Sequence, residues 1–424
     1  MHRPSPLARS TARVVLGLAA LFLILPAVAL ADRDGDDKAR SARFATFNAS
    51  LNRASEGQLI RDLSTPGNAQ AATVAEIIQR DRPDVLLINE FDYDAKGKAL
   101  RLFQRNYLSK PHNGARPISF RYRYTAPSNT GIASGFDLNN NGQAVTTPGA
   151  PGYGDDAFGF GAYPGQFGMA VYSRYPILSS RIRTFRKFLW KDMPGAKLPD
   201  NPSTPEPQDF YSQEEKNVFR LSSKSHWDIP VRVGRKAISF LASHPTPPVF
   251  DGPEDRNGKR NFDEIRFWAD YISANRRRSA YIYDDRGRRG GLVRRRRFVI
   301  AGDQNSDPED GDSIAGSIQQ LTEHPLVDTS FTPSSQGAVE AAALQGGANN
   351  AHQSDPKFDT ADFADRQPGN LRADYVLPRI GQGIRSGAVF WPVRSDPLVR
   401  LTGEFPFPSS DHRLVWLDVR APGS

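Results

Sequence analysis

Short apolar runs that end in polar side chains recur along the chain. The runs are rich in β-branched and aromatic residues and are bounded by turn formers, a pattern that indicates strands. Because buried strands hold side chains with little freedom, polar groups at many strand ends favour a catalytic site. The polar residues in or just beyond these runs are Asn48, Asn89, Glu90, His244, Asp303, Asn305, Asp374, Asp411 and His412.

Helical periodicity alternates with several of these runs. In "AATVAEIIQRDRPD", Val74, Ile77 and Ile78 share one face, and the pattern stops before Pro83. A second helix is predicted over residues 261–272, in "NFDEIRFWADYI". Strands that alternate with helices predict a single α/β body.

The N-terminal residues have the pattern of a secretory signal peptide. Three arginines precede an apolar run that closes on Ala29-Leu30-Ala31. We therefore expect a signal peptide over residues 1–31 and a mature domain over residues 32–424, which makes the protein secreted and extracytoplasmic. The apolar run also approaches the length of a short membrane span, so an uncleaved anchor is the alternative. After cleavage, no stable membrane anchor is expected.

The composition favours a globular protein with one large core. The chain has no cysteine, so burial of apolar residues rather than disulfide bonds must stabilise it. Its formal net charge of +8 includes the arginines of the signal segment, so the mature domain is only mildly basic. Glycines and prolines concentrate in residues 126–166, 192–207, 246–258 and 332–369, which we interpret as surface loops. We expect long loop insertions in one domain at residues 126–168, 192–216, 274–297 and 331–370.

The polar residues at the strand ends suit a divalent metal and phosphate chemistry. Carboxylates and amides are hard oxygen donors, and the chain has no histidine spacing typical of zinc sites, so Mg²⁺, Mn²⁺ or Ca²⁺ fits better than zinc. His244 and His412 are suited to proton transfer or to stabilising phosphate charge. Together these groups predict metal-assisted hydrolysis at phosphorus.

Six short motifs follow one another in the chain: "TFN", "LLINE", "SHP", "GDQN", "ADYV" and "SDH". With these motifs, in this order, the chain resembles the endonuclease/exonuclease/phosphatase superfamily, which has the deoxyribonuclease-like fold. The resemblance covers most of the mature domain. It implies an α/β fold, a four-layer sandwich of two packed mixed β-sheets flanked by helices, in a secreted bacterial-type member of that superfamily.

The resemblance also implies a role for each residue that matches a motif. Glu90, with Asn48 and Asp411, would hold the divalent cation, Mg²⁺ or Mn²⁺. Asp303 would orient or deprotonate the attacking water, and Asn305 would contact the scissile phosphate. The remaining catalytic residues would be His412, the imidazole of the terminal pair, Asp374, which orients that imidazole, and His244, a general acid for the leaving oxygen.

One insertion carries a second metal pattern. Asp137, Asn139, Asn141 and Gly142 have the D-x-N-x-N-G spacing of a calcium loop, which makes Ca²⁺ a further candidate cofactor. Pro148 stands at the twelfth position, where such a loop has its bidentate glutamate. A polar turn is therefore the alternative interpretation.

Two basic stretches are candidates for anion contacts. Arg220, Lys224 and His226 lie in an extended stretch, where they either bind substrate phosphates or are simply exposed. Ten arginines fall between Arg276 and Arg297. A nucleic-acid face is one interpretation of this run. Acidic residues interrupt it, however, so a solvated hairpin is favoured.

These observations predict a secreted, divalent-metal-dependent phosphoesterase that hydrolyses phosphate mono- or diesters by in-line attack of water. An extracellular endonuclease acting on DNA or RNA is the first alternative. Nucleic acid is not favoured as a partner, because long insertions narrow a cleft that duplex DNA must enter. A non-catalytic binding protein on the same scaffold is the second alternative. We expect a monomer whose partner is the phosphate-ester substrate.

Overall fold

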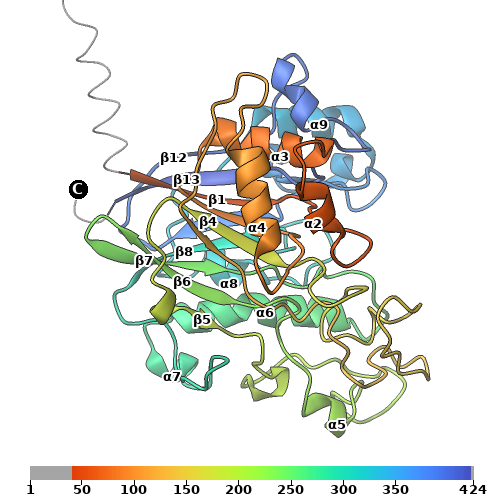
Figure 1. Ribbon diagram of the computed structural model, residues 1–424. Coiled ribbons are helices and arrows are strands. Elements are labelled where there is room, and N and C mark those ends of the chain that lie inside the picture. Colours follow the sequence, from red (N-terminus) through yellow and green to blue (C-terminus); the bar gives the residue numbers. More distant parts are fainter. Residues whose placement is uncertain (1–40, 422–424) are drawn as a thin grey trace, which may run out of the picture. The chain divides into compact units, whose positions relative to one another are not determined.

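Two β-sheets packed face to face form the body of the protein (Figure 1). The structure is a computed structural model that describes residues 41–421, so the expected signal peptide at residues 1–31 lies outside the described residues. Helices cover the outer face of each sheet, which gives four layers. The predicted fold, an α/β sandwich of two mixed sheets flanked by helices, is confirmed.

The first sheet is built from both ends of the described chain. Its strands are β1 (Ser41–Asn48), β2 (Val85–Asn89), β3 (Tyr122–Tyr124), β4 (Met169–Ser173), β12 (Ile384–Val389) and β13 (Val415–Arg420). They lie in the order β12-β13-β1-β2-β4-β3, with β1 parallel to β2 and the other neighbours antiparallel. The outer face is covered by α2 (Gln58–Leu63), α3 (Ala69–Asp81), α4 (Lys98–Phe103) and the π-helical turn η1 (Gln104–Leu108).

The second sheet comes from the middle of the chain. Its strands are β5 (Arg183–Thr184), β6 (Trp227–Val233), β7 (Lys236–Ala242), β8 (Arg297–Asp303) and β11 (Asp374–Pro378). They lie in the order β11-β8-β7-β6-β5, with β7 parallel to β8 and the other neighbours antiparallel. Helices α6 (Arg256–Ile272) and α8 (Gln319–Thr322) pack on its outer face.

Shorter elements lie in the long loops between these strands. They include a two-stranded ribbon of β9 (Ala361–Asp362) and β10 (Asn370–Leu371), and helices α5 (Gln213–Lys216), α7 (Arg276–Ser279) and α9 (Gln336–Gln345). The 3-10 turns are η2 (Ser179–Arg181), η3 (Trp190–Asp192), η4 (Gly347–Ala351), η5 (Pro356–Phe358) and η6 (Pro397–Leu401).

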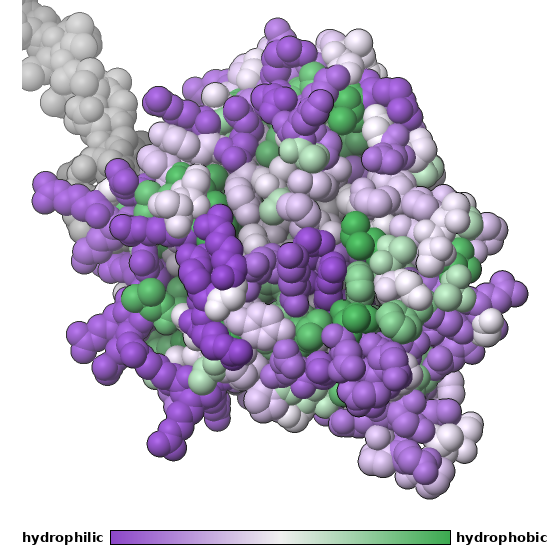
Figure 2. Space-filling view, turned by 60° about the horizontal axis from the view of Figure 1, so that its bottom comes forward, coloured by the Kyte–Doolittle hydropathy of each residue, from purple (hydrophilic) through white to green (hydrophobic). Residues whose placement is uncertain are grey.

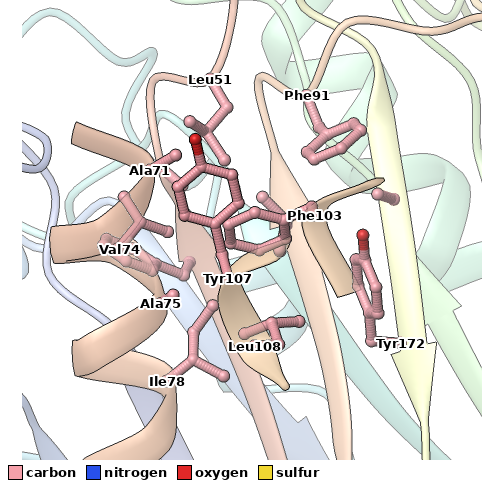
Figure 3. Packing of buried hydrophobic residues seen from close by; sticks show 14 of the residues in the cluster. Leu51, Ala71, Val74, Ala75, Ile78, Phe91, Phe103, Tyr107, Leu108 and Tyr172 are labelled. Atoms are coloured by element: carbon pink, nitrogen blue, oxygen red, sulfur yellow. The ribbon is translucent and has the colours of Figure 1, made fainter. Parts of the chain in front are cut away.

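Alternation along the strands separates an inner core from two outer cores. On β1, Phe44 faces the second sheet, whereas Ala45 and Phe47 face the helices. Across the sandwich, the ring of Phe44 lies 5.8 Å from the ring of Phe240. Figure 3 shows the outer core between the first sheet and helices α3 and α4. The second outer core lies between the second sheet and α6. The same alternation decides which strand-end residues point between the sheets.

Both helices that the sequence predicts are present. The Asn68 side chain caps α3 by accepting a hydrogen bond of 2.9 Å from the N–H of Ala71. Helix α6 begins at Arg256, earlier than the predicted residue 261, because Asp251 accepts a hydrogen bond from the N–H of Asn257 at 2.6 Å. This capping contact comes from outside the helix and leaves no mark in the apolar pattern. Among the described helices, none is long and apolar enough to cross a membrane.

A buried carboxylate ties α3 to the C-terminal part of the chain. The side chain of Glu76 is 2% exposed and accepts hydrogen bonds from Arg400 at 2.9 Å and from Asn113 at 2.7 Å, and a further one from Arg80. Burial alone would raise the pKa of Glu76, but these hydrogen bonds lower it to about 2. The carboxylate therefore stabilises the fold above its ordinary pKa of 4.5, and this contribution is lost as the pH falls through about 2.

We expect Glu76→Gln to lower the free energy of unfolding by about 2 kcal/mol at neutral pH, because two arginines lose a charged acceptor. The difference from the wild type should shrink as the pH approaches the folded pKa, since the wild-type carboxyl is then protonated as well. Urea denaturation at a series of pH values measures both effects. Glu323→Gln, at an exposed glutamate, is the matched control. Equal stability of Glu76→Gln and wild type at neutral pH would contradict this account.

Candidate active site

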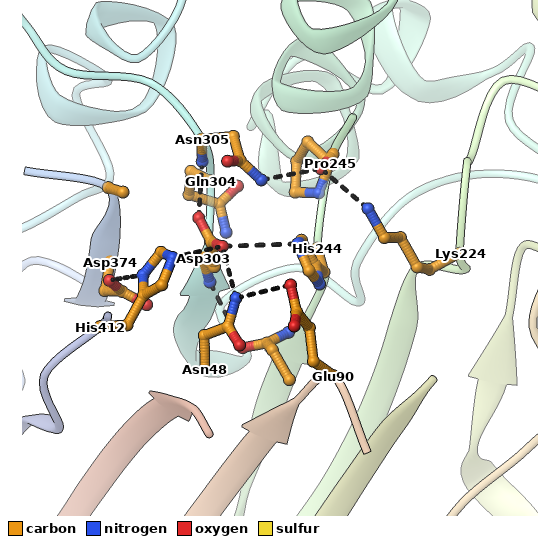
Figure 4. Close-up of polar contacts among 12 residues, drawn as sticks. Asn48, Glu90, Lys224, His244, Pro245, Asp303, Gln304, Asn305, Asp374 and His412 are labelled. Carbon is orange, nitrogen blue, oxygen red and sulfur yellow. Dashed lines mark hydrogen bonds and ion pairs between the residues drawn. The ribbon is translucent and has the colours of Figure 1, made fainter. Parts of the chain in front are cut away.

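Polar side chains from both sheets meet at one end of the sandwich (Figure 4). Asn48 ends β1 and points between the sheets, as Phe44 does four residues earlier on the same strand. β1 and β2 are parallel with Asn48 beside Asn89, so Glu90 follows at the same edge. On the second sheet, Asp303 ends β8 and faces Asn48. The polar residues at the strand ends therefore converge, because side chains alternate along each strand and neighbouring strands pair in register.

Three further groups reach this end of the sandwich. β7 and β8 are parallel, so His244, just beyond β7, lies beside Asp303. β11 runs antiparallel to β8 and places Asp374 opposite Asp303 in register. His412 comes from the segment before β13, in the first sheet, and contacts Asp374. The structure thus brings together residues that lie far apart in the sequence.

The side chain of Asn48 joins the two sheets. Its amide nitrogen Nδ2 donates to Glu90 Oε1 at 3.1 Å and to Asp303 Oδ2 at 3.0 Å. Asn52 donates to the other oxygen of Glu90 at 2.8 Å. Neutral amides therefore orient both carboxylates without cancelling their charges.

His412 is held by a carboxylate and a hydroxyl group. Its Nδ1 lies 2.8 Å from Asp374 Oδ2, and the Thr360 hydroxyl donates to the same oxygen at 3.0 Å. Burial alone would lower the pKa of His412, but the charges of Asp374 and Asp303 raise it well above its ordinary value. His412 is therefore an imidazolium, and its Nε2 lies 3.7 Å from Asp303.

His244 differs from His412 because its neutral form is favoured. Its Nε2 lies 3.4 Å from Asp303 Oδ2. Burial, reinforced by the charges of Lys224 and His412, lowers the pKa of His244 well below its ordinary value. Its buried Nδ1 has no hydrogen-bond partner among the described residues. A neutral imidazole and a charged one therefore flank the same carboxylate.

Asp303 is placed to exchange a proton near neutral pH. Burial raises its pKa to about 7, against the lowering effect of the positive charge on His412. A carboxyl group that titrates there matches the requirement for a general base. The N–H of Asn305 donates to Asp303 Oδ1 at 2.9 Å, and the Asn305 amide donates to the carbonyl of Pro245 at 3.1 Å. Asn305 and Glu90 have φ values of 49° and 57°, in the left-handed region, which asparagine adopts readily and glutamate less often.

β7 and β8 approach each other closely next to Asp303. Gly302 has a φ of 150°, and a Cβ at this position would lie 1.9 Å from the carbonyl oxygen of Ser243. Any side chain there would push apart the strand ends that carry His244 and Asp303. The glycine of the "GDQN" motif is therefore a steric requirement of the site.

Glu90 and Asp411 offer oxygen ligands for a divalent cation. Burial, together with the negative charge of Asp411, raises the pKa of Glu90. The two carboxylates are hard oxygen donors that suit Mg²⁺ or Mn²⁺. The amide oxygen of Asn48, a further candidate ligand, accepts a hydrogen bond from the N–H of Ser50 at 3.3 Å. The chemistry of these residues therefore fits a divalent metal.

A second group of side chains that could bind a metal includes the hydrogen-bonded pair of His412 and Asp374. Atoms of Asp303, Asp374 and His412 lie within 4.8 Å of one another, and they are the one such group among the described residues. Some of their ligand atoms are engaged, because His412 Nδ1 bonds to Asp374 and the Asn48 amide donates to Asp303, whereas Asp374 Oδ1 has no hydrogen-bond partner among the described residues. The family resemblance of the motifs assigns the metal to Glu90 and Asp411 instead.

Of the three residues predicted to bind substrate phosphates, the structure brings Lys224 to the site. Lys224 is 7% exposed and lines the same cavity as Glu90 and His244. Its Nζ has a single long hydrogen bond, 3.4 Å to the carbonyl of Pro245. Burial lowers the pKa of Lys224, although the charges of Glu264, Glu90 and Asp303 act in the opposite direction. A buried ammonium with so few partners is suited to hold an anion.

Arg220 and His226 do not reach this site, so their predicted role is corrected. The His226 ring lies 4.8 Å from the ring of Phe267 and is hydrogen-bonded to Ser222, and burial lowers its pKa to about 4. Arg220 donates to Asn129 Oδ1 at 2.6 Å. Both side chains stabilise the packing of the loop, because the extended stretch runs through the body and not along its surface.

The stretch with the calcium-loop spacing forms a polar turn. Both oxygens of Asp137 accept backbone hydrogen bonds, from the N–H groups of Asn141 at 3.1 Å and Gly142 at 2.7 Å. The side-chain oxygens of Asn139 and Asn141 also accept from backbone N–H groups, at 3.1 and 2.9 Å. Backbone N–H groups thus hold these side chains in a turn, as the alternative interpretation expects.

The arginine-rich segment lies away from the polar cluster. The bridge between Tyr283 and Arg289 gives it the hairpin form favoured by the sequence. Arg297 begins β8 and Asp303 ends it, so the adjoining arginines are ~20 Å from the site at the usual rise per strand residue.

The arrangement defines a class of enzyme. Carboxylates that suit a divalent metal, a carboxyl group that titrates near neutrality and two imidazoles are the groups that hydrolysis of phosphate esters requires. A known family has this chemistry. The sequence profile of the Endonuclease/Exonuclease/phosphatase family matches residues 45–412, so the chain belongs to that family and is a metal-dependent hydrolase of phosphate ester bonds. The resemblance noted in the motifs is confirmed.

Several solved structures are similar to the chain. One is an endonuclease/exonuclease/phosphatase from Beutenbergia cavernae, with 16% identity and a TM-score of 0.46 over 91% of this chain and 72% of that one. Another is sphingomyelinase C from Streptomyces griseocarneus, with 12% identity and a TM-score of 0.43 over 89% and 99%. A third is a mutant beta toxin from Staphylococcus aureus with bound magnesium ions, with 10% identity and a TM-score of 0.39 over 89% and 99%. No curated protein sequence matches the chain.

Sequence reasoning missed two residues that orient the site. Thr360 lies in the insertion at residues 331–370, and the bridge between Ala361 and His412 brings it to Asp374. Asn52 follows the "TFN" motif and holds Glu90. Asn52 had a detectable signal, since it is a second amide close to the end of β1. Thr360 had none, because it lies in a loop without a strand or helix pattern.

We expect Thr360→Val to lower kcat about 10- to 100-fold, since the hydroxyl orients the carboxylate that orients His412. KM should stay close to that of the wild type, because Thr360 is placed to act through Asp374 rather than on the substrate. Thr360→Ser should restore most of the rate. Thr402→Val is the control, at a buried threonine whose hydroxyl donates to the Val399 carbonyl. An unchanged kcat in Thr360→Val would remove the positioning role.

Proposed function

We propose that the protein is a secreted phosphoesterase that cleaves phosphate mono- or diesters with Mg²⁺ or Mn²⁺ as its metal. The observation that carries the proposal is the set of contacts around Asp303. Asn48, His244 and His412 approach this one carboxylate from both sheets, at 3.0, 3.4 and 3.7 Å. The expectation of secretion rests on the signal-peptide pattern at residues 1–31.

In the proposed reaction, water attacks phosphorus in line with the bond that breaks. Asp303 takes a proton from the water as the new oxygen–phosphorus bond forms. The bond between phosphorus and the leaving oxygen breaks, and His244 gives a proton to that oxygen. The His412 imidazolium stabilises the negative charge of the phosphoryl group. Glu90, Asp411 and Asn48 would hold a divalent cation, which would supply further stabilisation of the negative charge on the phosphate.

The charge state of His244 fits this role once an anionic substrate is present. In the free site, burial and then the positive charges of Lys224 and His412 lower the pKa of His244. A phosphate anion beside these groups would offset the two charges and raise the pKa of His244. We propose that His244 is protonated in this way when the substrate is bound.

The position of the basic residues favours an ester other than duplex nucleic acid. An endonuclease needs positive side chains along the groove that holds the duplex. Here the arginine run precedes Arg297, at the opposite end of β8 from Asp303. The insertion at residues 126–168 lines the cavity beside the site and leaves less room for a duplex to reach the catalytic groups.

We also propose that the protein acts as a monomer.

A panel of phosphate esters tests the proposal. The mature chain should hydrolyse at least one simple phosphomonoester or phosphodiester in the presence of Mg²⁺ or Mn²⁺. A chelator should abolish the activity, and added metal should restore it. Phosphate or alcohol release is the measurement, and plasmid DNA and RNA belong in the same panel. Preference for nucleic acid over every small ester would favour the endonuclease instead.

Asp303→Asn should reduce kcat at least 10³-fold with little change in stability, because the amide has the shape of the carboxyl group but cannot accept the proton. His412→Gln should have a loss of similar size. His352→Gln is the matched control, at a histidine that bonds to the carbonyl of Pro368 outside the site. Retention of wild-type activity in Asp303→Asn would rule out the mechanism.

Lys224→Met should weaken binding of the phosphate group, because it removes a buried ammonium that has one long hydrogen bond in the free site. We expect KM to rise at least tenfold, and kcat to fall if the ammonium also contacts the transition state. Steady-state kinetics on the best ester of the panel separate the two effects. Lys191→Met, at an exposed lysine paired with Asn217, is the control. Unaltered kcat and KM would exclude Lys224 from the binding site.

A further inference from the structure

An apolar cavity adjoins the catalytic groups. Its volume is about 530 Å³, within the usual range for sites that bind small molecules. One wall comes from the insertion at residues 126–168, and the facing wall from the loop after β7 and the first turns of α6. The side chains that give it its apolar character are Leu138, Phe160, Phe167, Tyr211, Phe219 and Val249.

The cavity opens onto one side of the catalytic cluster. Glu90, Lys224 and His244 line it, whereas Asp303, Asp374 and His412 do not. A phosphate held between the two imidazoles would therefore direct one substituent into the cavity, on the side of His244. In the proposed reaction His244 protonates the leaving oxygen, so the group in the cavity is the leaving alcohol.

The two arginines in the cavity walls are already engaged by other groups. Arg260 donates to the carbonyls of Leu221 at 2.8 Å and Phe158. Arg256 forms an ion pair with Glu254. These arginines are not free to hold a second phosphate or a nucleotide. The cavity therefore selects for apolar groups.

Two phenylalanines at the cavity are unusually exposed. Phe250 is 87% exposed and Phe160 is 65% exposed. Phe250 also has a φ of 66°, a conformation that is unfavourable for a bulky side chain. Exposed apolar groups appear as patches on a mostly hydrophilic surface (Figure 2). An aromatic ring held in water at a conformational cost is explained if it covers a bound apolar ligand.

We propose that this cavity binds the leaving alcohol of the substrate and that the substrate is a phosphate ester of a long-chain or aromatic alcohol. The inference rests on the proposed phosphoesterase function and specifies its substrate class. Hydrolysis breaks the bond between phosphorus and the alcohol oxygen, the attacking water supplies the new oxygen on phosphorus, and the alcohol leaves with the proton from His244. Burial of the apolar chain contributes binding free energy that a short alcohol lacks.

A homologous series of n-alkyl phosphates and methyl n-alkyl phosphates, from ethyl to octyl, tests the proposal. The leaving alcohols have nearly the same pKa, so chain length is the variable. Each ester is used below its critical micelle concentration, and alkanol release is measured. We expect kcat/KM to rise about threefold to fourfold per methylene group until the cavity is filled. Hydrolysis at a rate independent of chain length would overturn this inference and leave the phosphoesterase proposal standing.

Variants at the cavity locate the effect. Phe160→Ser and Phe250→Ser should each reduce the ratio of octyl to ethyl kcat/KM several-fold, and Ala157→Leu, which fills the cavity, should do so for the longest chains. Phe405→Ser is the matched control, because Phe405 is 86% exposed and does not line the cavity. A general loss of folded enzyme lowers both rates equally, so a change in the ratio of octyl to ethyl kcat/KM reports on the cavity alone. An unchanged ratio in all three cavity variants would refute the proposed site, and failure of the wild type to hydrolyse any ester would refute the phosphoesterase function as well.

Discussion

The amide group of Asn48 sets the geometry on which the catalytic centre depends. It donates to Glu90 from its own sheet and to Asp303 from the facing sheet, so the two carboxylates are separated by one amide nitrogen. Such a contact needs two sheets at a fixed spacing, which the inner core provides through pairs such as Phe44 and Phe240. The packing of apolar residues between the sheets is thus also what positions the polar residues at their edge.

Around this contact, one environment gives two imidazoles different properties. Asp374 and Asp303 hold a positive charge on His412, while burial and nearby positive charges keep His244 neutral. Phosphate hydrolysis uses both states, because one group must stabilise negative charge and another must transfer a proton. The difference comes from partners and not from exposure, since both imidazoles are buried. The apolar cavity on the side of His244 extends this asymmetry to the substrate.

The strand-end residues were predictable because strand periodicity and pairing act over short distances. Once β1, β2, β7 and β8 are recognised, the inward direction of Asn48 and Asp303 follows from alternation alone. In loops, no comparable periodicity predicts the direction of a side chain. His226 is buried against Phe267, although the sequence of its stretch is compatible with an exposed position. Asp137 accepts hydrogen bonds from backbone N–H groups in a turn that has the residue spacing of a calcium loop. Thr360 reaches Asp374 through a loop path that the sequence pattern does not encode.

The same loop has a consequence for the durability of the enzyme. Thr360 belongs to an insertion that is attached to the sandwich partly through Arg413, whose N–H donates to the Thr360 carbonyl at 2.7 Å and whose guanidinium pairs with Asp362 at 2.8 Å. The attachment itself is buried, but other parts of the insertion, such as Asn350 and Ala351, are exposed and can open at a lower free-energy cost than the sandwich core. A proteolytic nick or mild heating that loosens the insertion would therefore lower turnover through Asp374 and His412 while the two sheets remain folded. Loss of turnover is then an early sign of damage, ahead of the cooperative melting of the body.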